Sequence, residues 1–118
     1  MRDLAPHIVR QRLLIEALYT GTVDEPFVDR FLHGLAEHLD LRTYAEATIV
    51  APGGQGREEN EGFDAFLPLI DSGISLYVWT SARFLAVVLF TCKAFDPGDA
   101  VAYTRTFFGL GEHTSHAF

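Results

Sequence analysis

Cysteine, lysine, methionine and tryptophan each occur only once in this chain of 118 residues. The single cysteine, Cys92, excludes an internal disulfide and fits a reducing compartment, so we expect a cytoplasmic location. With Lys93 as the only lysine, 9 basic residues face 16 acidic ones and the net charge is −7. This balance predicts no nucleic-acid partner and no membrane partner, because both surfaces are bound by clustered Lys and Arg.

Long apolar runs are also missing. No stretch is long and apolar enough to span a bilayer. Charged residues such as Arg2, Asp3 and Arg10 interrupt the first twenty residues, unlike the continuous apolar segment of a signal peptide. Since 48% of the residues are hydrophobic and ten are Phe, we expect one soluble domain over residues 1–118 with a single core.

The order of the predicted elements indicates an α+β fold, a two-layer sandwich. Residues 10–19 predict a strand, with a short helix over 13–18 as an alternative, and further strands are predicted over 44–50, 63–70, 74–80 and 83–92. Helices are predicted over 24–39 and 96–108, and the tail after Gly109 is predicted to be loose. Short turns between strands favour a mostly antiparallel sheet of four to five strands with both helices on one face, leaving the other face for a ligand or a second subunit.

Both helices carry start signals. Apolar residues recur at helical spacing in the first, at Phe27, Phe31, Leu32, Leu35 and Leu39. Thr22 with Glu25 fits a capping box, and Asp24 is a competing N-cap. In the second helix, Asp96 is the expected cap, followed by Pro97 at the first helical position.

Residues 74–80 alternate between two kinds of side chain. Ile74, Leu76 and Val78 share one face, which we expect to pack against the helices. Ser75, Tyr77 and Trp79 share the other, which suits either a ligand pocket or a surface facing solvent or another subunit.

Three further patterns predict little chemistry. The sequence Gly53-Gly54-Gln55-Gly56 lacks the Lys-Ser or Lys-Thr of a phosphate-binding loop, so residues 53–62 are interpreted as a mobile acidic loop. His113 and His116 could hold a metal if helical, but no carboxylate or thiolate accompanies them in the same element, so no metal site is predicted. His33 and His38 are expected to be solvated.

Residues 62–92 resemble the core of the bacterial S-adenosylmethionine decarboxylases. That family carries, in one ungapped run, Gly-x-Ser-Gly, a Glu-Ser-His cleavage site, His-x-Trp and Phe-Thr-Cys-Gly. Here the matching residues at the same spacing are Gly62, Ser72, Trp79 and Phe90-Thr91-Cys92. The likeness covers roughly residues 8–108.

The resemblance implies a self-cleaving enzyme. In that family the serine attacks the preceding carbonyl and becomes a pyruvoyl group, whose ketone accepts the electrons left when carbon dioxide departs. The roles of pyruvoyl precursor and proton donor would fall to Ser72 and Cys92, although a lone cysteine is more often a small buried hydrophobe. Phe63, Ser75 and Trp79 are the candidates for binding an S-adenosylmethionine-like ligand, and a homo-oligomer, most simply a dimer, is implied.

Four positions depart from the family pattern. Asp64 replaces a helper serine, Tyr77 a processing histidine, Asp71 the glutamate before the cleavage site and Gly73 the histidine after it. A tyrosine, whose ordinary pKa is about 10, is a weak base near neutral pH. Three hypotheses therefore stay open: a pyruvoyl-dependent decarboxylase, an unprocessed homologue that binds a ligand or regulates a paralogue, and an enzyme for another S-adenosylmethionine reaction with Asp64 as base.

Overall fold

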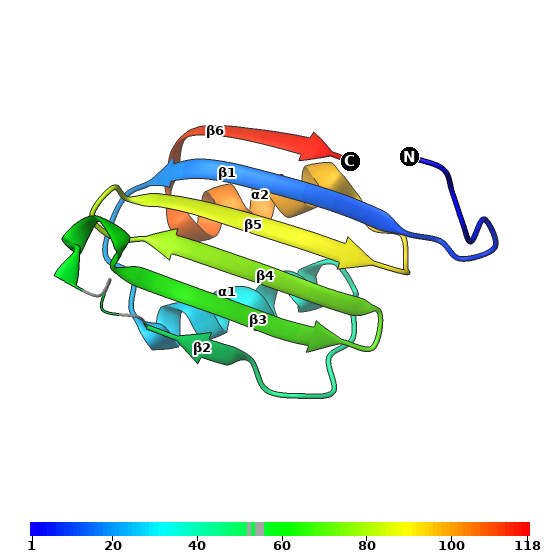
Figure 1. The fold of residues 1–118 in the computed structure, drawn as a ribbon, viewed down its shortest axis with the longest axis horizontal. Helices are drawn as coiled ribbons and strands as arrows, with labels where there is room; N and C mark the ends of the chain where they lie inside the picture. The colour runs from blue at the N-terminus through cyan, green and yellow to red at the C-terminus, as the bar shows by residue number, and fades with distance from the viewer. Residues whose placement is uncertain (52, 54–55) are drawn as a thin grey trace.

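Six antiparallel strands form one sheet in the order β2-β3-β4-β5-β1-β6, and two helices pack on one of its faces (Figure 1). The structure is a computed structural model that describes residues 1–51, 53 and 56–118. The elements are β1 (Gln11–Tyr19), α1 (Glu25–His38), β2 (Thr48–Val50), the short 3-10 helix η2 (Glu58–Asn60), β3 (Gly62–Leu69), β4 (Ser72–Trp79), β5 (Phe84–Thr91), α2 (Pro97–Phe108) and β6 (Leu110–Ala117). The predicted two-layer α+β class is confirmed.

The first strand became an inner strand of the sheet. β1 pairs with β5 on one side and with β6 on the other, so the alternative of a helix over residues 13–18 is wrong. Its helix-facing residues Leu13, Ile15, Ala17 and Tyr19 are buried, and the residues between them are more exposed. That period of two is the pattern of a strand with one covered face.

The tail after Gly109 is the main correction. It was predicted to be loose, but it forms β6 along β1, from Leu110 opposite Tyr19 to Ala117 opposite Leu13. All β6 side chains after Leu110 are exposed, so no hydrophobic pattern marks the strand, and its ladder to β1 holds it. Gly109, with φ +64°, makes the turn from α2 into β6. The sheet therefore has six strands instead of the four to five expected.

Both helices begin at predicted caps. The Asp24 carboxylate accepts a hydrogen bond of 2.9 Å from the N–H of Phe27, which makes Asp24 the N-cap of α1 in place of the Thr22 capping box. Asp96 accepts from the N–H groups of Gly98 and Asp99 at the start of α2. These bonds satisfy N–H groups that a helix leaves without internal partners.

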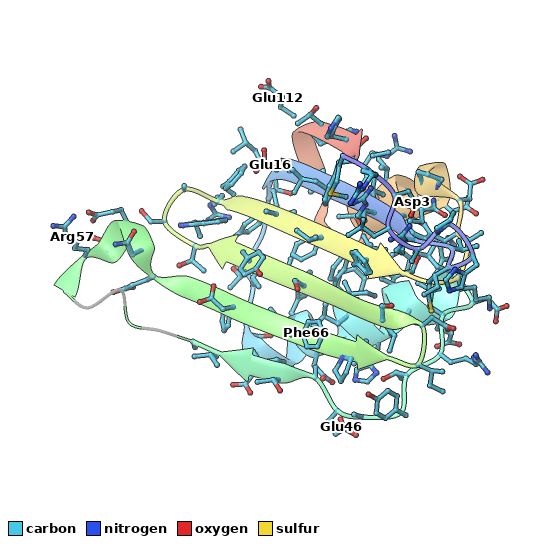
Figure 2. All side chains as sticks on the ribbon, turned by 45° about the vertical axis from the view of Figure 1, so that its right-hand side comes forward. Asp3, Glu16, Glu46, Arg57, Phe66 and Glu112 are labelled. Atoms are coloured by element: carbon cyan, nitrogen blue, oxygen red, sulfur yellow. The ribbon has the colours of Figure 1, made fainter. Side chains whose placement is uncertain are left out.

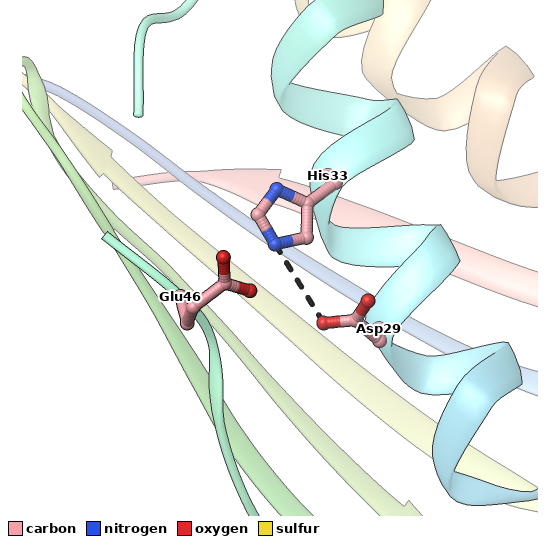
Figure 3. A group of neighbouring side chains, drawn as sticks. All are labelled: Asp29, His33 and Glu46. Atoms are coloured by element: carbon pink, nitrogen blue, oxygen red, sulfur yellow. Dashed lines mark ion pairs between the residues drawn. The ribbon is translucent and has the colours of Figure 1, made fainter. Parts of the chain in front are cut away.

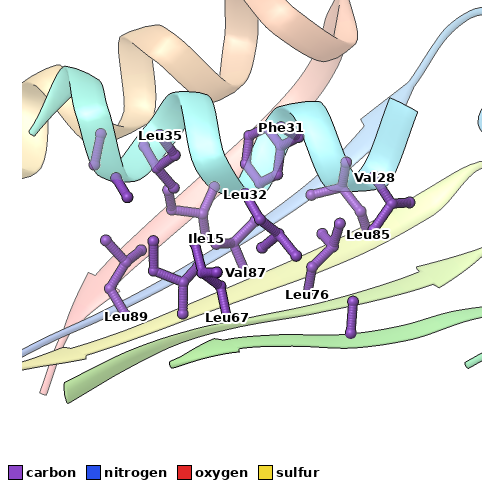
Figure 4. Close-up of a cluster of buried hydrophobic side chains, with 14 of the residues drawn as sticks. Ile15, Val28, Phe31, Leu32, Leu35, Leu67, Leu76, Leu85, Val87 and Leu89 are labelled. Carbon is purple, nitrogen blue, oxygen red and sulfur yellow. The ribbon is translucent and has the colours of Figure 1, made fainter. Parts of the chain in front are cut away.

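The core lies between the sheet and α1, as Figure 4 shows. The largest side chains with almost no exposure include Phe31, Leu32 and Leu35 from α1, with Ile15, Leu67, Leu76, Leu85 and Leu89 from the sheet. Burying one such side chain contributes about 1.5–3 kcal/mol, so the helix layer is held to this face by apolar contact.

The segment between α1 and β3 differs from expectation. The strand predicted over residues 44–50 spans only Thr48–Val50, and η2 lies within the predicted loop 53–62. Residues Gly54 and Gln55 of the predicted loop 53–62 fall outside the described part of the chain. Among the described residues, no helix is long and apolar enough to cross a membrane.

Candidate active site

Among residues 1–51, 53 and 56–118, none forms a layer over the sheet face opposite the helices. The predicted alternation in β4 is confirmed: Ile74, Leu76 and Val78 are at most 4% exposed under the helices, whereas Tyr77 on the other face is 38% exposed. Large apolar side chains stand out on this uncovered face, among them Phe66, labelled on β3 in Figure 2, together with Leu18, Val50 and Phe90. We call this surface the open face.

Ser72 has a strained backbone. It is the first residue of β4, directly after the two-residue turn Ile70-Asp71, so β4 begins two residues before the strand predicted over 74–80. Its φ is +122°, a conformation that side-chain-bearing residues rarely adopt. Such a conformation costs on the order of 1–3 kcal/mol and persists only where the surrounding ladder enforces it. Ser72 is held on both sides, opposite Leu69 of β3 and Thr91 of β5.

Cys92 contacts the peptide group in front of Ser72. The backbone N–H of Cys92 donates a hydrogen bond of 2.8 Å to the carbonyl oxygen of Asp71. This is the carbonyl that the Ser72 hydroxyl would attack, and an N–H in this position stabilises negative charge on its oxygen. The Cys92 thiol is exposed, so the interpretation of a buried hydrophobe is wrong.

The Asp71 carboxylate is anchored to Arg42. It accepts hydrogen bonds from the backbone N–H of Arg42 at 3.2 Å and from its guanidinium at 3.4 Å, and Asp71 is 5% exposed. The N–H of Arg42 is the main cause that lowers the pKa of this carboxyl below its ordinary value. Asp71 therefore stays ionised and fixes the turn. Nothing in the sequence pointed to Arg42, which lies 29 positions away.

Asp64 and Tyr77 lie far from Ser72. They are paired across β3 and β4, with exposed side chains on the open face. Tyr77 is five positions along β4 from Ser72, and a strand rises about 3.3 Å per residue, so roughly 17 Å separates their backbones. Within one chain, the structure does not bring these two predicted catalytic residues to the serine.

The predicted ligand-binding residues divide between the two faces. Ser75 and Trp79 lie on the open face, and the Trp79 ring packs against Phe84 with centroids 5.2 Å apart. Phe63 pairs with Val78 and packs against the buried core from the helix-covered face, so it does not share a surface with Trp79.

Gly73 is covered by an aromatic ring. A Cβ at this position would lie 2.5 Å from the ring of Phe66, so a larger residue would require the ring to move. The ring occupies the space that a histidine side chain at position 73 would need.

A hollow that the sequence did not indicate lies between β1, β5 and β6. It is lined by Glu16, Leu18 and Phe84, and by Glu112 and His113 from β6. Figure 2 shows Glu16 and Glu112 projecting from this side of the sheet. Because β6 was not predicted, no sequence pattern could have placed Glu112 near Glu16. Like Tyr77, the hollow lies at the opposite end of the strands from Ser72.

The two histidines considered for a metal do not meet. His113 pairs with Ala17 and His116 with Leu14 of β1, and side chains of neighbouring positions in a strand alternate between faces. The two imidazoles therefore point to opposite sides of β6, and the helical arrangement that a shared ion required is absent.

The chain is thus a two-layer α+β sandwich. It has a strained serine at the β3–β4 hairpin and a cysteine whose N–H bonds to the peptide group in front of that serine. The family model described as S-adenosylmethionine decarboxylase matches residues 18–118. This chain belongs to the S-adenosylmethionine decarboxylase family. The expected family resemblance is thereby confirmed.

Individual relatives agree with this assignment. The chain is 29% identical over 80 residues to the S-adenosylmethionine decarboxylase proenzyme of Clostridium botulinum (strain Hall, type A), and a second type A strain gives the same values. The match covers 67% of this chain and 63% of the relative. The crystal structure of the adenosylmethionine decarboxylase from Aquifex aeolicus has the same fold, with a TM-score of 0.69 and 17% identity over 94% of this chain and 89% of that one.

Proposed function

We propose that this chain is a pyruvoyl-dependent decarboxylase of S-adenosylmethionine or a related amino acid, formed by self-cleavage between Asp71 and Ser72. The observation that carries the proposal is the peptide group at this bond. Its serine has a strained φ of +122°, and its carbonyl oxygen already accepts a hydrogen bond from the N–H of Cys92. Strain raises the energy of the intact amide, and the N–H donor stabilises the oxyanion that forms on attack.

Cleavage follows from the groups at this turn. The Ser72 hydroxyl oxygen bonds to the Asp71 carbonyl carbon as its proton is lost, and the C–N bond breaks when the nitrogen takes up a proton, so the amide becomes an ester. Loss of the Ser72 α-proton then expels the ester oxygen and leaves residues 1–71 with an ordinary carboxylate. Addition of water and release of ammonia convert the remainder of residue 72 to a pyruvoyl group.

The residues around position 72 fit such a group. When present, the pyruvoyl ketone supplies an electron sink for decarboxylation. The exposed thiol of Cys92 follows β5 directly and is placed at the same hairpin end, where it can donate a proton. Asp71, held by Arg42, keeps the turn in register before cleavage.

The ligand hollow suits a cationic substrate. Glu16 and Glu112 supply two carboxylates, and Phe84 supplies an aromatic ring beside that of Trp79. A sulfonium or ammonium ion is attracted both by carboxylates and by the face of an aromatic ring. S-adenosylmethionine carries both cations, which is why it is the first substrate we propose.

The distance between this hollow and Ser72 indicates a shared site. The hollow, Asp64 and Tyr77 lie near one end of the strands, and the hairpin with Ser72 lies at the other end, roughly 17 Å away along β4. If two copies stack their open faces with antiparallel strands, the hairpin end of each sheet, where Ser72 lies, comes next to the hollow of the other copy. The exposed apolar side chains Phe66, Tyr77 and Phe90 support burial of this face in a homodimer.

The second candidate is an unprocessed homologue that binds the same class of ligand without a pyruvoyl group. The exposed, paired Asp64 and Tyr77, in place of a helper serine and a histidine, favour it. In that case the hollow would still bind its cationic ligand, and Ser72 would stay an ordinary serine.

The deciding experiment is the intact mass of the purified chain under denaturing conditions. We expect fragments 1–71 and 72–118, with the second fragment lighter than its hydrolysis product by the elements of ammonia and reactive toward a hydrazine reagent. The Ser72→Ala variant should give one species and no hydrazine adduct, and release of labelled carbon dioxide from S-adenosylmethionine should follow the same pattern. A single full-length species from the native chain, combined with ligand binding by calorimetry, would establish the second candidate instead.

A further inference from the structure

A second cluster of polar side chains lies on the helix side of the sheet. Asp29 and His33 are one turn apart on α1, and Glu46 lies in the connection to β2. One ligand atom from each lies within 4.8 Å of the others. In Figure 3 the side chains of all three converge on one point between α1 and this connection.

The charges of this cluster are incompletely balanced. The His33 Nε2 atom lies 3.6 Å from an Asp29 carboxylate oxygen. Within the part of the chain that the structure describes, neither Asp29 nor Glu46 forms an ion pair with an arginine or lysine. Two carboxylates held this close repel each other, and a cation between them would remove the repulsion.

We propose that Asp29, His33 and Glu46 bind a divalent transition-metal ion of the Zn²⁺ class. An imidazole nitrogen with two carboxylate oxygens is a ligand set that such ions accept, whereas Mg²⁺ and Ca²⁺ prefer oxygen ligands throughout. Metal–ligand bonds of about 2.0–2.2 Å in tetrahedral geometry place neighbouring ligand atoms roughly 3.4 Å apart. The 3.6 Å between His33 Nε2 and the Asp29 oxygen is close to that spacing.

The position of the cluster indicates a structural role for the ion. It joins the middle of α1 to the segment that leads into β2, a strand of three residues at the edge of the sheet that pairs with β3. It lies on the helix-covered side of the sheet, whereas the hollow of Glu16 lies on the open face. The ion therefore fixes this connection to the helix and stabilises the folded chain, because a ligand that binds only the folded state raises its stability.

The test is metal binding to the full chain after treatment with a chelator. Zn²⁺ affinity and stoichiometry are measured by competition with a chromophoric chelator, and thermal unfolding is followed with Zn²⁺ or Mg²⁺. We expect one Zn²⁺ ion to bind per chain. Zn²⁺ should raise the melting temperature, and Mg²⁺ should leave it unchanged. Substituting Co²⁺ should give an absorption spectrum of tetrahedral coordination.

Matched variants locate the ion. His33→Asn and Glu46→Gln should each lower Zn²⁺ affinity by about tenfold or more, since removal even of groups that support a ligand costs 10–100-fold. His38→Asn and Glu37→Gln change exposed residues of the same helix and should leave the affinity unchanged. The proposal is overturned if His33→Asn binds Zn²⁺ like the native chain, if Cys92→Ser or a His113/His116 double variant removes the binding, or if Mg²⁺ stabilises the chain equally.

Discussion

The backbone N–H of Cys92 donates a 2.8 Å hydrogen bond to the carbonyl oxygen of Asp71, the residue that precedes the strained Ser72. Cys92 thus has two roles in the proposed chemistry. Its amide contacts the peptide bond to be cleaved, and its exposed thiol is the proposed proton donor for decarboxylation. The two roles use different atoms, so they can be separated by substitution.

Cys92→Ala should keep self-cleavage and lose turnover. Alanine retains the backbone N–H and removes the thiol, so fragments 1–71 and 72–118 should still form. Decarboxylation should fall about 10²-fold or more, the usual contribution of a positioned acid. The measurements are intact mass and carbon dioxide release. A variant that fails to cleave while its melting temperature is unchanged would assign the processing step to the thiol instead of the amide.

Ser72→Gly should be more stable than Ser72→Ala. Both variants remove the hydroxyl and cannot form the pyruvoyl group, but only glycine adopts a φ of +122° without strain. After the greater chain entropy that glycine loses on folding is subtracted, we expect a difference of about 1 kcal/mol in the free energy of unfolding. Urea denaturation of the two variants measures it. Equal stabilities would mean that the backbone at position 72 is relaxed.

Stability should depend on the ionisation of Asp71 in acid. The N–H and guanidinium of Arg42 hold the pKa of this carboxyl below the ordinary 3.8 in the folded chain. The ionised Asp71 carboxylate therefore stabilises the folded chain fully above the unfolded-state pKa. This stabilisation is lost as the pH falls through the lower folded-state pKa. In a Ser72→Ala background, the added Asp71→Asn change should be destabilising at about pH 5 and have a smaller effect at about pH 3.

Arg42→Gln provides the second arm of this measurement. This substitution removes the guanidinium but keeps the backbone N–H of residue 42. The free energy of unfolding should therefore depend less strongly on pH, but still depend on it. Denaturation curves for the Asp71→Asn variant and its parent that stay parallel across this range would contradict the assignment of Asp71 as an ionised anchor.

Phe90→Glu should weaken self-association. Phe90 is 43% exposed on the open face, at the end of β5 near Cys92. A buried charge at the centre of an apolar interface costs about 2 kcal/mol or more in association free energy. Tyr44→Glu is the control, because Tyr44 is 70% exposed and lies outside the strands. Sedimentation velocity should show monomers for Phe90→Glu and dimers for the control, and a native chain that is itself monomeric would refute the stacked arrangement.

Local sequence patterns predicted most of the fold because buried residues recur at a regular spacing along each helix and along most of the strands. The five predicted strands and two helices exist, and the β4 residues divide between the faces as expected, since each apolar residue in these segments is placed by its neighbours on the same element. β6 escaped prediction because its exposed side chains carry no such period, and only its backbone pairing with β1 makes it a strand.

The amino-acid sequence by itself determined the family and the two-layer class and made Ser72 and Cys92 the candidate site residues, because these inferences depend on motif spacing and on side-chain periodicity. Tertiary structure decided which groups meet. Strand pairing and packing of the chain produce three features of the candidate site. These are the φ of Ser72, the hydrogen bond from Cys92 to Asp71 and the ion pair of Asp71 with Arg42. The approach of Glu46 to His33 has the same origin. Contacts between residues distant in the chain follow from packing of the whole molecule, which no local pattern encodes.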